Sequence, residues 1–372
     1  MIRSAFWVVW IGCAAIATGH AQVLLSGQTA AHFLKSSPSQ SPRTVNNGRP
    51  SFGWESDLFV DGRISDRVTA LSTFRVTEDL VLNVDYAAIR LTDLTPIHLN
   101  FQAGRFDLPF GNLGERRFPR RNFLFGLPLL YEYGTALPDH LTSEQEILAA
   151  RGTGSGMPLL DGGVYDLGAM LFGSWGILDY ALAVSSGTIS ATTYGTQNSN
   201  SDVGTVARLA VTPFTGLTVG TAYAQGAYMD EPSSASPQTV NVNNFRQHAL
   251  EIDLEFSRDH AVVYGEAVFN RWPVPLQTGD QNFDIFGYYI EGKYTVIPRL
   301  YVALRMSGLH FGTATLDQQQ QPWDYDVAEF EGGVGYFIDR DVLIKLVRRE
   351  TRTYGGTNPK DGLTVLQLAV AY

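Results

Sequence analysis

Apolar and polar residues alternate along most of this chain with the period of two that is typical of β-strands. Around position 252, for example, the apolar residues are Leu250, Ile252 and Leu254, and acidic residues stand between and after them. The last ten residues alternate in the same way and end on Tyr372. The pattern predicts an all-β protein whose strands have one apolar and one polar face.

Fifteen segments carry this pattern, and most are close to the roughly 9–11 residues that a tilted strand needs to cross a membrane. They span 54–64, 68–77, 80–91, 97–106, 163–173, 176–186, 202–212, 216–228, 244–256, 260–271, 284–295, 299–311, 326–337, 341–353 and 362–372. A closed barrel pairs the last strand with the first and leaves no free edge. Because such a barrel has an even number of strands, we expect one more within 22–50 or 107–162. The predicted fold is a transmembrane antiparallel up-and-down β-barrel of about 16 strands, within a range of about 14–18.

The connections between the predicted strands alternate in length. Those at 257–260, 296–299 and 338–341 are tight, whereas those at 229–243, 272–283, 312–325 and 354–361 are longer and polar. Short periplasmic turns opposite longer extracellular loops are typical of outer-membrane barrels. The alternating last strand with its final Tyr372 resembles the C-terminal assembly signal of bacterial outer-membrane barrels. An edge strand of a soluble β-domain is the alternative interpretation of this strand alone.

The N-terminus has the pattern of a secretory signal, with Arg3 before an apolar run and small residues before Gln22. We expect a signal peptide over 1–21, a flexible periplasmic segment over 22–50 that is rich in Ser, Gln, Asn and Pro, and the barrel over 51–372. A lipoprotein anchor at Cys13, the only cysteine, is the alternative. The predicted location is the outer membrane of a Gram-negative cell.

The stretch 101–111, Phe-Gln-Ala-Gly-Arg-Phe-Asp-Leu-Pro-Phe-Gly, leads from the end of a predicted strand into the longest connection. It resembles the Gly-Arg/Gln-Phe-x-x-Pro-Phe-Gly motif of the phosphate-selective porin (O and P type) superfamily. Together with the barrel pattern and the terminal strand, this resemblance implies a porin. The anion selectivity of that family depends on basic residues that line the constriction, and this chain has no Lys-rich counterpart to them.

The connection over 107–162 is long enough to suggest a functional loop that folds inward. Four arginines lie between its phenylalanines: Arg116, Arg117, Arg120 and Arg121. If the loop enters the barrel, their guanidinium groups would line a constriction and attract anionic solutes. Alternatively, these arginines face lipopolysaccharide outside the barrel, or they pair with Glu115, Asp139 and lumen acids to hold the loop in place.

The alternation also assigns charged side chains to the lumen. The candidate lumen-facing residues are Arg208, Glu251, Asp253, Glu255, Glu266, Glu291, Lys293, Arg305, Glu329, Glu331, Lys345 and Arg349. Acids outnumber bases among them, and cross-strand pairs that stiffen the wall are the expected use of most. No subset stands out as a selectivity ring.

Motifs for catalysis are scarce. The seven histidines include no pair with metal-ligand spacing. The Gly-rich stretch 152–156 precedes no Lys-Ser/Thr, so a phosphate-binding loop is not indicated. We therefore expect no enzyme activity and no catalytic, cofactor or metal site, and the net charge of −10 argues against nucleic acid as a partner.

The sequence thus predicts an outer-membrane porin for passive diffusion of small hydrophilic solutes, anions among them. The alternative is a barrel that serves as a scaffold, an adhesin or the sheath of a protein assembly such as an electron conduit. The expected partners are outer-membrane lipid and lipopolysaccharide, the barrel-assembly machinery and the solutes, and a homo-trimer is an assembly that the sequence leaves open.

Overall fold

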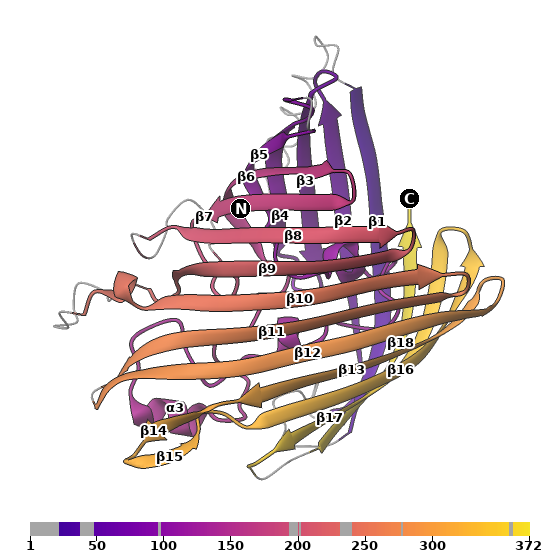
Figure 1. Cartoon of the computed structure of the whole chain (residues 1–372). Helices are drawn as coiled ribbons and strands as arrows, with labels where there is room; N and C mark the ends of the chain where they lie inside the picture. The colour runs from indigo at the N-terminus through magenta and orange to yellow at the C-terminus, as the bar shows by residue number, and fades with distance from the viewer. Residues whose placement is uncertain are drawn as a thin grey trace.

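A closed β-barrel makes up most of the protein (Figure 1). The computed structural model describes residues 22–37, 48–95, 98–192, 200, 202–230, 240–276, 278–356 and 360–372. Within these residues, sixteen strands pair with their neighbours in antiparallel fashion and close on themselves. The predicted fold class and strand number are confirmed, and the signal peptide predicted over 1–21 lies outside the described residues.

The elements follow one another in simple order. The barrel strands are β1 (Gln22–Ser36), β2 (Ser51–Arg63), β3 (Val68–Thr77), β4 (Leu82–Leu91), β5 (Asn100–Asp107), β6 (Tyr165–Trp175), β7 (Leu178–Ser185), β8 (Gly204–Phe214), β9 (Leu217–Ala227), β10 (Arg246–Arg258), β11 (Ala261–Leu276), β12 (Gly279–Ile297), β13 (Leu300–Phe311), β16 (Asp326–Asp339), β17 (Val342–Tyr354) and β18 (Lys360–Ala371). The other elements are the hairpin of β14 (Thr313–Leu316) and β15 (Gln319–Pro322), the α-helices α2 (Leu129–Glu132) and α3 (Glu144–Ala150), and the 3-10 turns η3 (Gly114–Arg117) and η4 (Val242–Asn244). None of the helices in the described part of the chain is long and apolar enough to cross a membrane.

The first strand lies where the sequence predicted a flexible segment. β1 pairs with β2 on one edge and with β18 on the other, so the last strand closes the barrel on the first. The prediction for 22–50 is therefore wrong over Gln22–Ser36, which is the strand missing from the sequence-based count. Its inward side chains include Gln28, which donates to the Asp57 carboxylate at 2.8 Å. Several outward positions of β1 hold small residues such as Thr29 and Ala31 in place of the large apolar side chains that reveal the other strands.

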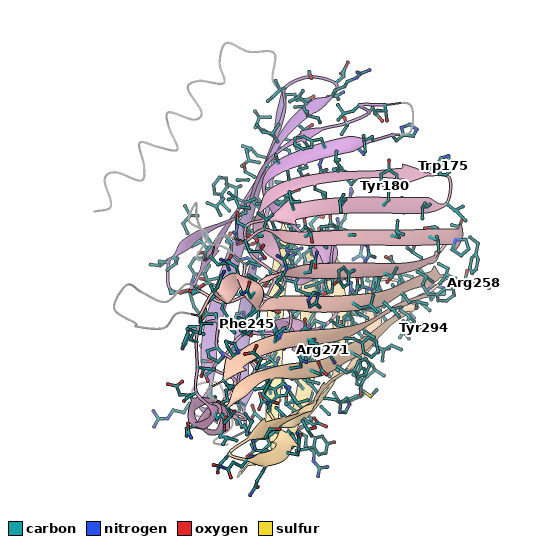
Figure 2. All side chains as sticks on the ribbon, turned by 60° about the vertical axis from the view of Figure 1, so that its left-hand side comes forward. Trp175, Tyr180, Phe245, Arg258, Arg271 and Tyr294 are labelled. Carbon is teal, nitrogen blue, oxygen red and sulfur yellow. The ribbon has the colours of Figure 1, made fainter. Side chains whose placement is uncertain are left out.

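The outward face of the wall is apolar. On β10 the outward residues Leu250, Ile252 and Leu254 are exposed, and the acids between them are turned into the lumen. Aromatic residues such as Trp175 and Tyr294 lie near the end with the tight turns (Figure 2). An apolar band flanked by aromatic rings is the surface that a barrel presents to lipid.

A β-bulge changes the face assignment within β4. The sequence places Leu82, Val84, Tyr86 and Ala88 on one apolar face, but the register shifts where Thr73 and Phe74 of β3 pair with Tyr86 and Val84. After this shift Tyr86 points inward and meets the ring of Tyr165 at 6.2 Å between centroids. An inserted residue reverses the alternation beyond it, so the predicted face is wrong for the second half of this strand.

The connections between strands lie at two ends of the barrel and differ in length. β6–β7, β8–β9, β10–β11, β12–β13 and β16–β17 are joined by two residues each at the end where the C-terminus lies. The connection predicted over 272–283 is shorter than expected, because β11 continues to Leu276 and β12 already begins at Gly279. The short turns at the end of the C-terminus are on the periplasmic side in an outer-membrane barrel.

We predict that an epitope inserted at Gly279 is accessible to antibody on intact cells and that one inserted at Asp339 is not. Gly279 lies at the tip of the β11–β12 hairpin, and Asp339 ends β16 beside a tight turn at the opposite end. Labelling of permeabilised cells shows that both epitopes are present. Surface labelling at Asp339 but not at Gly279 would reverse the orientation.

We also predict that deletion of Tyr372, or Tyr372→Lys, leaves unfolded, protease-sensitive protein in the periplasm. The backbone of Tyr372 exchanges two hydrogen bonds with Gly27, at 2.8 and 2.9 Å, and so completes the pairing of the last strand with the first. A Cβ on Gly27 would lie 2.6 Å from the Tyr372 ring, so the ring fills the space that glycine leaves. Normal heat-modifiable barrel in the outer membrane from either variant would contradict a role as assembly signal.

Candidate functional site

The segment from 108 to 164, between β5 and β6, lies inside the barrel. It starts with Leu-Pro-Phe-Gly, and Gly111 has a φ of +80° that only glycine adopts readily. A Cβ at Gly111 would also lie 2.2 Å from the Tyr131 hydroxyl. The end of the motif therefore turns the chain inward and leaves room for a later part of the same loop. We call residues 108–164 the inward loop.

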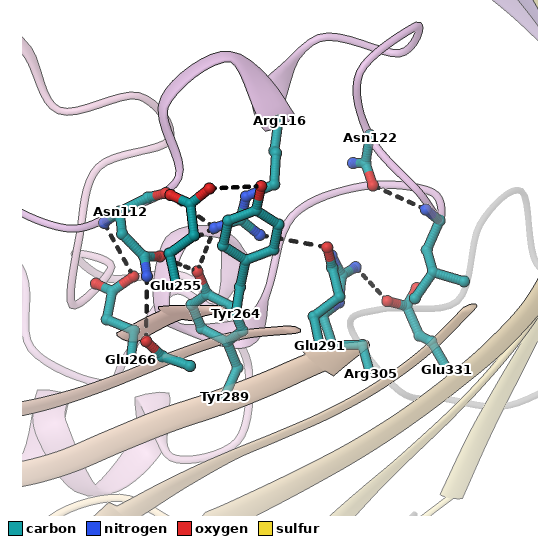
Figure 3. Close-up of polar contacts among 12 residues, drawn as sticks. Asn112, Arg116, Asn122, Glu255, Tyr264, Glu266, Tyr289, Glu291, Arg305 and Glu331 are labelled. Carbon is teal, nitrogen blue, oxygen red and sulfur yellow. Dashed lines mark hydrogen bonds and ion pairs between the residues drawn. The ribbon is translucent and has the colours of Figure 1, made fainter. Parts of the chain in front are cut away.

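Arg116 fastens the inward loop to the wall at β11 and β12 (Figure 3). Its guanidinium donates to Glu291 at 3.3 Å and to the Tyr289 hydroxyl at 2.8 Å, and it lies 3.7 Å from the centre of the Tyr264 ring. It also donates to the backbone oxygen of Asn112 at 2.8 Å. With its donors committed to the wall and to its own loop, Arg116 has a structural role here.

Arg305 of β13 continues this network on the wall. Its guanidinium forms ion pairs with Glu291, at 3.1 Å, and with Glu331 of β16. All three side chains are 1% exposed. Arg305 also donates to the carbonyl of Phe125 in the inward loop, at 3.2 Å. One buried cation thus joins two carboxylates of the wall to the loop backbone.

Lys345 of β17 binds the inward loop at residues 119–124. Its ammonium donates to the carbonyl oxygens of Pro119, Asn122 and Leu124 at 2.9, 3.1 and 2.6 Å, and the side chain is buried. An ammonium group has three donors, and all three are used. The loop backbone thus takes the place of a carboxylate partner.

A buried acid, Glu266 of β11, binds the loop at a fourth point. It accepts from the Tyr131 hydroxyl at 2.8 and 2.9 Å to its two oxygens and from the Asn112 amide at 3.4 Å. Burial, followed by the nearby Glu266, raises the pKa of Tyr131 well above its usual value. The phenol therefore keeps its proton and remains a donor to the carboxylate.

The part of the inward loop after residue 127 packs in an apolar core. Leu129, Leu130 and Leu159 are completely buried, as are Trp272 of β11 and Trp323. Burying one such leucine contributes about 1.5–3 kcal/mol. The loop is therefore held by apolar packing nearer the extracellular end and by the charged network nearer the periplasmic end.

Asp324, between β15 and β16, joins the inward loop to the extracellular end of the wall. Its carboxylate accepts from the amides of Ala136 and Gly152, both at 2.8 Å, and the side chain is completely buried. Burial raises the pKa of Asp324 from 3.8 to about 6, and these backbone donors and Arg151 only partly oppose the shift. The folded protein therefore binds the Asp324 proton more tightly than the unfolded chain does, although the loop amides by themselves favour the charged carboxylate.

We predict from this shift that acid stabilises the folded structure around Asp324. Protonation of Asp324 contributes stability that is fully present below pH 3.8 and is lost as the pH rises through about 6. Hydrogen exchange of the Ala136 and Gly152 amides, corrected for intrinsic pH dependence, should slow as the pH falls through this window. In Asp324→Asn the protection should not depend on pH. Faster corrected exchange in acid would contradict the sign.

The four loop arginines do not act as one group. Arg117 donates to Asp107 at 3.2 Å and to the carbonyl of Gly163 at 3.0 Å. Arg120 donates to the carbonyl of Arg340 at the periplasmic turn, and Arg121, which is exposed, pairs with Glu115 at 3.5 Å. Of the roles that the sequence left open, pairing inside the barrel describes Arg116 and Arg117 better than a shared constriction of free arginines does.

The residues assigned to the lumen all lie on inward-facing positions of their strands. They form pairs across the wall and to the loop: Arg208 with Glu251 and Asp253, Arg305 with Glu291 and Glu331, Arg349 with Glu329 and Glu132, and Tyr264 with Glu255. Lys293 lies over the Phe123 ring at 4.5 Å. Sequence reasoning missed Asp324, and no local pattern could have revealed it.

Two cavities lie beside the inward loop within the described part of the chain. The larger, of about 650 Å³, is bounded by the start of the loop and by β5–β10, and its lining includes Arg117, Arg208 and Glu255. The smaller, of about 230 Å³, lies between the loop and the β2–β3 and β17–β18 walls and is lined by Arg117, Glu55 and others. Arg117 is thus part of the wall of both. Among the described residues, no group of His, Cys, Asp and Glu could hold a metal ion.

Solved structures with the same architecture are outer-membrane proteins. OmpT of Vibrio cholerae, folded in vitro and described as a trimer form, has a TM-score of 0.57 at 11% identity, over 95% of this chain and 99% of that one. The outer-membrane channel DcaP of Acinetobacter baumannii has 0.59 at 11%, over 95% and 97%. The anion-selective porin from Comamonas acidovorans has 0.59 at 10%, over 95% and 100%.

The barrel is of the porin type. No family model matches the sequence, and no curated protein sequence matches it either. At these identities the likeness concerns the fold, so the resemblance to the phosphate-selective superfamily extends to the porin-type barrel and not to a phosphate site. The apolar outer face and the porin-type fold confirm the predicted location in the outer membrane.

Proposed function

We propose that this protein is an outer-membrane porin for the passive diffusion of small hydrophilic solutes. The observation that carries the proposal is the cavity of about 650 Å³ inside the barrel, which is lined by charged and polar groups of the wall and the inward loop. In barrels of this size, a loop that narrows the polar lumen limits which solutes can pass.

Arg117 is the constriction residue in this proposal. It contributes to the walls of both cavities, so a solute that moves between them passes its guanidinium. The side chain is held by Asp107, by the carbonyls of Gly163 and Gly114, and by the Tyr165 ring at 4.1 Å. These contacts fix its position and keep the passage narrow.

Anion preference is not part of the proposal. The sequence-based hypothesis needs several arginines that present free donors to a passing solute. Arg116 is committed to Glu291 and Tyr289, and Arg117 to Asp107 and two carbonyls. Their charges are compensated within the protein, so the selectivity has to be argued from the remaining groups.

Single-channel conductance of the purified protein in a planar bilayer tests the proposal. We expect discrete ohmic openings, with a larger conductance in Arg117→Ser than in the unchanged protein. Arg348→Ser is the matched control, because Arg348 is on the outward face of β17 and pairs with Glu350. A folded protein that never conducts would reject the porin function.

The apolar core favours a second function. It fills the extracellular half of the lumen with packed side chains such as Leu129 and Trp323, which suits a sealed barrel that serves as a scaffold or as the sheath of a protein assembly. The two functions differ in one measurement. A sealed barrel conducts only after the inward loop is removed, whereas a porin conducts with the loop in place.

The expected partners follow from the proposed location. They are outer-membrane lipid and lipopolysaccharide around the apolar band, the barrel-assembly machinery that inserts the strands, and the solutes. The homo-trimer is retained as a proposal, supported by the trimer form of OmpT among the solved structures of the same fold. Chemical cross-linking in detergent tests it.

A further inference from the structure

The larger cavity has more acidic than basic side chains on its wall. Its charged lining residues among those described are Asp107, Asp179, Asp253, Glu255, Arg117 and Arg208. A cavity of about 650 Å³ is about as wide as the Debye length of roughly 8–10 Å at ordinary ionic strength. An ion inside it therefore senses the charges of the whole wall.

Both arginines of this wall are compensated by carboxylates. Arg117 pairs with Asp107 at 3.2 Å, and the carboxylate is the more exposed partner, at 44% against 6%. Arg208 is shared by Asp253, at 2.7 Å, and the buried Glu251, at 3.1 Å. Neither arginine adds an uncompensated positive charge to the cavity.

Two carboxylates on the same wall form no ion pair with a cation in the described part of the chain. Asp179 of β7 is exposed to the cavity and makes no polar contact with the described residues. Glu255 of β10 is also exposed, and its one polar contact among the described residues is a long hydrogen bond of 3.4 Å from the Tyr264 hydroxyl. These two groups leave the cavity with an excess of negative charge.

Small residues lie between Asp179 and Asp253 on this wall. The pairing register places Asp179 opposite Ala210, Ala210 opposite Gly220, and Gly220 opposite Asp253 in one row across β7–β10. A Cβ at Gly220 would lie 2.3 Å from Asp253 Oδ2. The alanine leaves the Asp179 carboxylate uncovered, whereas the Asp253 carboxylate lies over Gly220 and is buried beside Arg208.

We propose that the lumen selects small cations over anions, and that Asp179 and Glu255 set this preference. The inference depends on the proposed porin function and adds the charge class of the solute. Carboxylates in a narrow, low-dielectric passage raise the local concentration of cations and lower that of anions. The preference weakens at high salt, because exposed charges are screened.

Four further basic groups of the lumen act elsewhere. Lys293 lies over the Phe123 ring, and Arg120 binds the carbonyl of Arg340 at the periplasmic end. Lys345 and Arg75 line the smaller cavity, where Lys345 binds three loop carbonyls and Arg75 pairs with Asp57 at 2.8 Å. None of these groups lies on the wall of the larger cavity.

The reversal potential in a KCl gradient across a planar bilayer tests the inference. For the unchanged protein we expect K⁺ to be about two- to fivefold more permeant than Cl⁻ at about 0.1 M salt, with the ratio falling towards one at about 1 M. In Asp179→Asn/Glu255→Gln the ratio at low salt should fall close to one. The matched control is Asp280→Asn/Asp317→Asn, which removes the same charge from the extracellular rim and should keep the original ratio.

The results that would contradict the porin function differ from those that would contradict the cation preference. A protein that forms no channel rejects the porin function itself. A channel that prefers Cl⁻, or a cation preference that survives loss of Asp179 and Glu255, overturns the inference and leaves the porin function standing. Heat-modifiable migration of each variant confirms that the barrel is folded before its conductance is compared.

Discussion

Replacing residues 113–160 with a short Gly-Ser linker is expected to raise the single-channel conductance by at least about twofold, because a lumen constriction limits ion flow. The inward loop contributes walls to both cavities, and its apolar part fills the extracellular half of the barrel. Without it the lumen fills with water, which hydrates the charged wall. The measurement is conductance in planar bilayers, and the barrel itself should remain closed because its strands pair without the loop.

A variant that shortens the β14–β15 hairpin is the control for this excision. That hairpin lies at the extracellular rim and is not part of the sheet that forms the barrel. Its shortening should change the conductance far less than removal of the inward loop. Equal conductance in the loop-free and unchanged proteins would place the loop outside the path of the solute.

Arg305→Ala is expected to be the most destabilising single change in the lumen. It leaves Glu291 and Glu331 without the cation that lies between them, and breaking a buried ion pair by removing one partner costs about 3–5 kcal/mol. The loop also loses a donor to the Phe125 carbonyl. The free energy of unfolding in urea, followed by the loss of heat-modifiable migration, measures the effect.

Two further variants separate lost pairing from lost packing at this site. Arg305→Met together with Glu291→Gln and Glu331→Gln removes the charges as a set and should recover much of the stability. Arg348→Ala removes an arginine from the exposed outward face of the wall, where an ion pair contributes little. If Arg305→Ala were as mild as Arg348→Ala, the network around Arg305 would not stabilise the protein.

Most of the barrel could be predicted from the alternation of residues, because one face of each strand contacts lipid. β10 illustrates this: Leu250, Ile252 and Leu254 face outward as the pattern indicates. The pattern failed in β1, where small residues such as Thr29 and Ala31 stand at outward positions. It also failed beyond Val84 in β4, because a bulge inserts one residue and no sequence signal marks it.

The lumen could be predicted residue by residue but not as a network. Strand alternation is local, so it places Glu291, Arg305 and Lys345 on the inward face. Their partners in the loop are not local: Arg116 and Glu291 are 175 positions apart, and Lys345 and Pro119 are 226 apart. Backbone carbonyls, which bind Lys345, carry no sequence signature at all. The roles of the loop arginines therefore needed the three-dimensional structure.

The anchors of the inward loop have a consequence for the order of folding. Glu266, Glu291, Arg305 and Lys345 all follow the loop in the sequence, so the chain makes the loop well before these four binding partners. Until β12 and β13 are in place, Leu129 and Leu130 lack the part of the wall against which they pack and can associate with other chains. Contacts this distant in sequence form slowly, since the closure of long loops costs entropy. Docking of the loop is then a late event, and the nascent barrel passes through a stage in which its lumen is still empty.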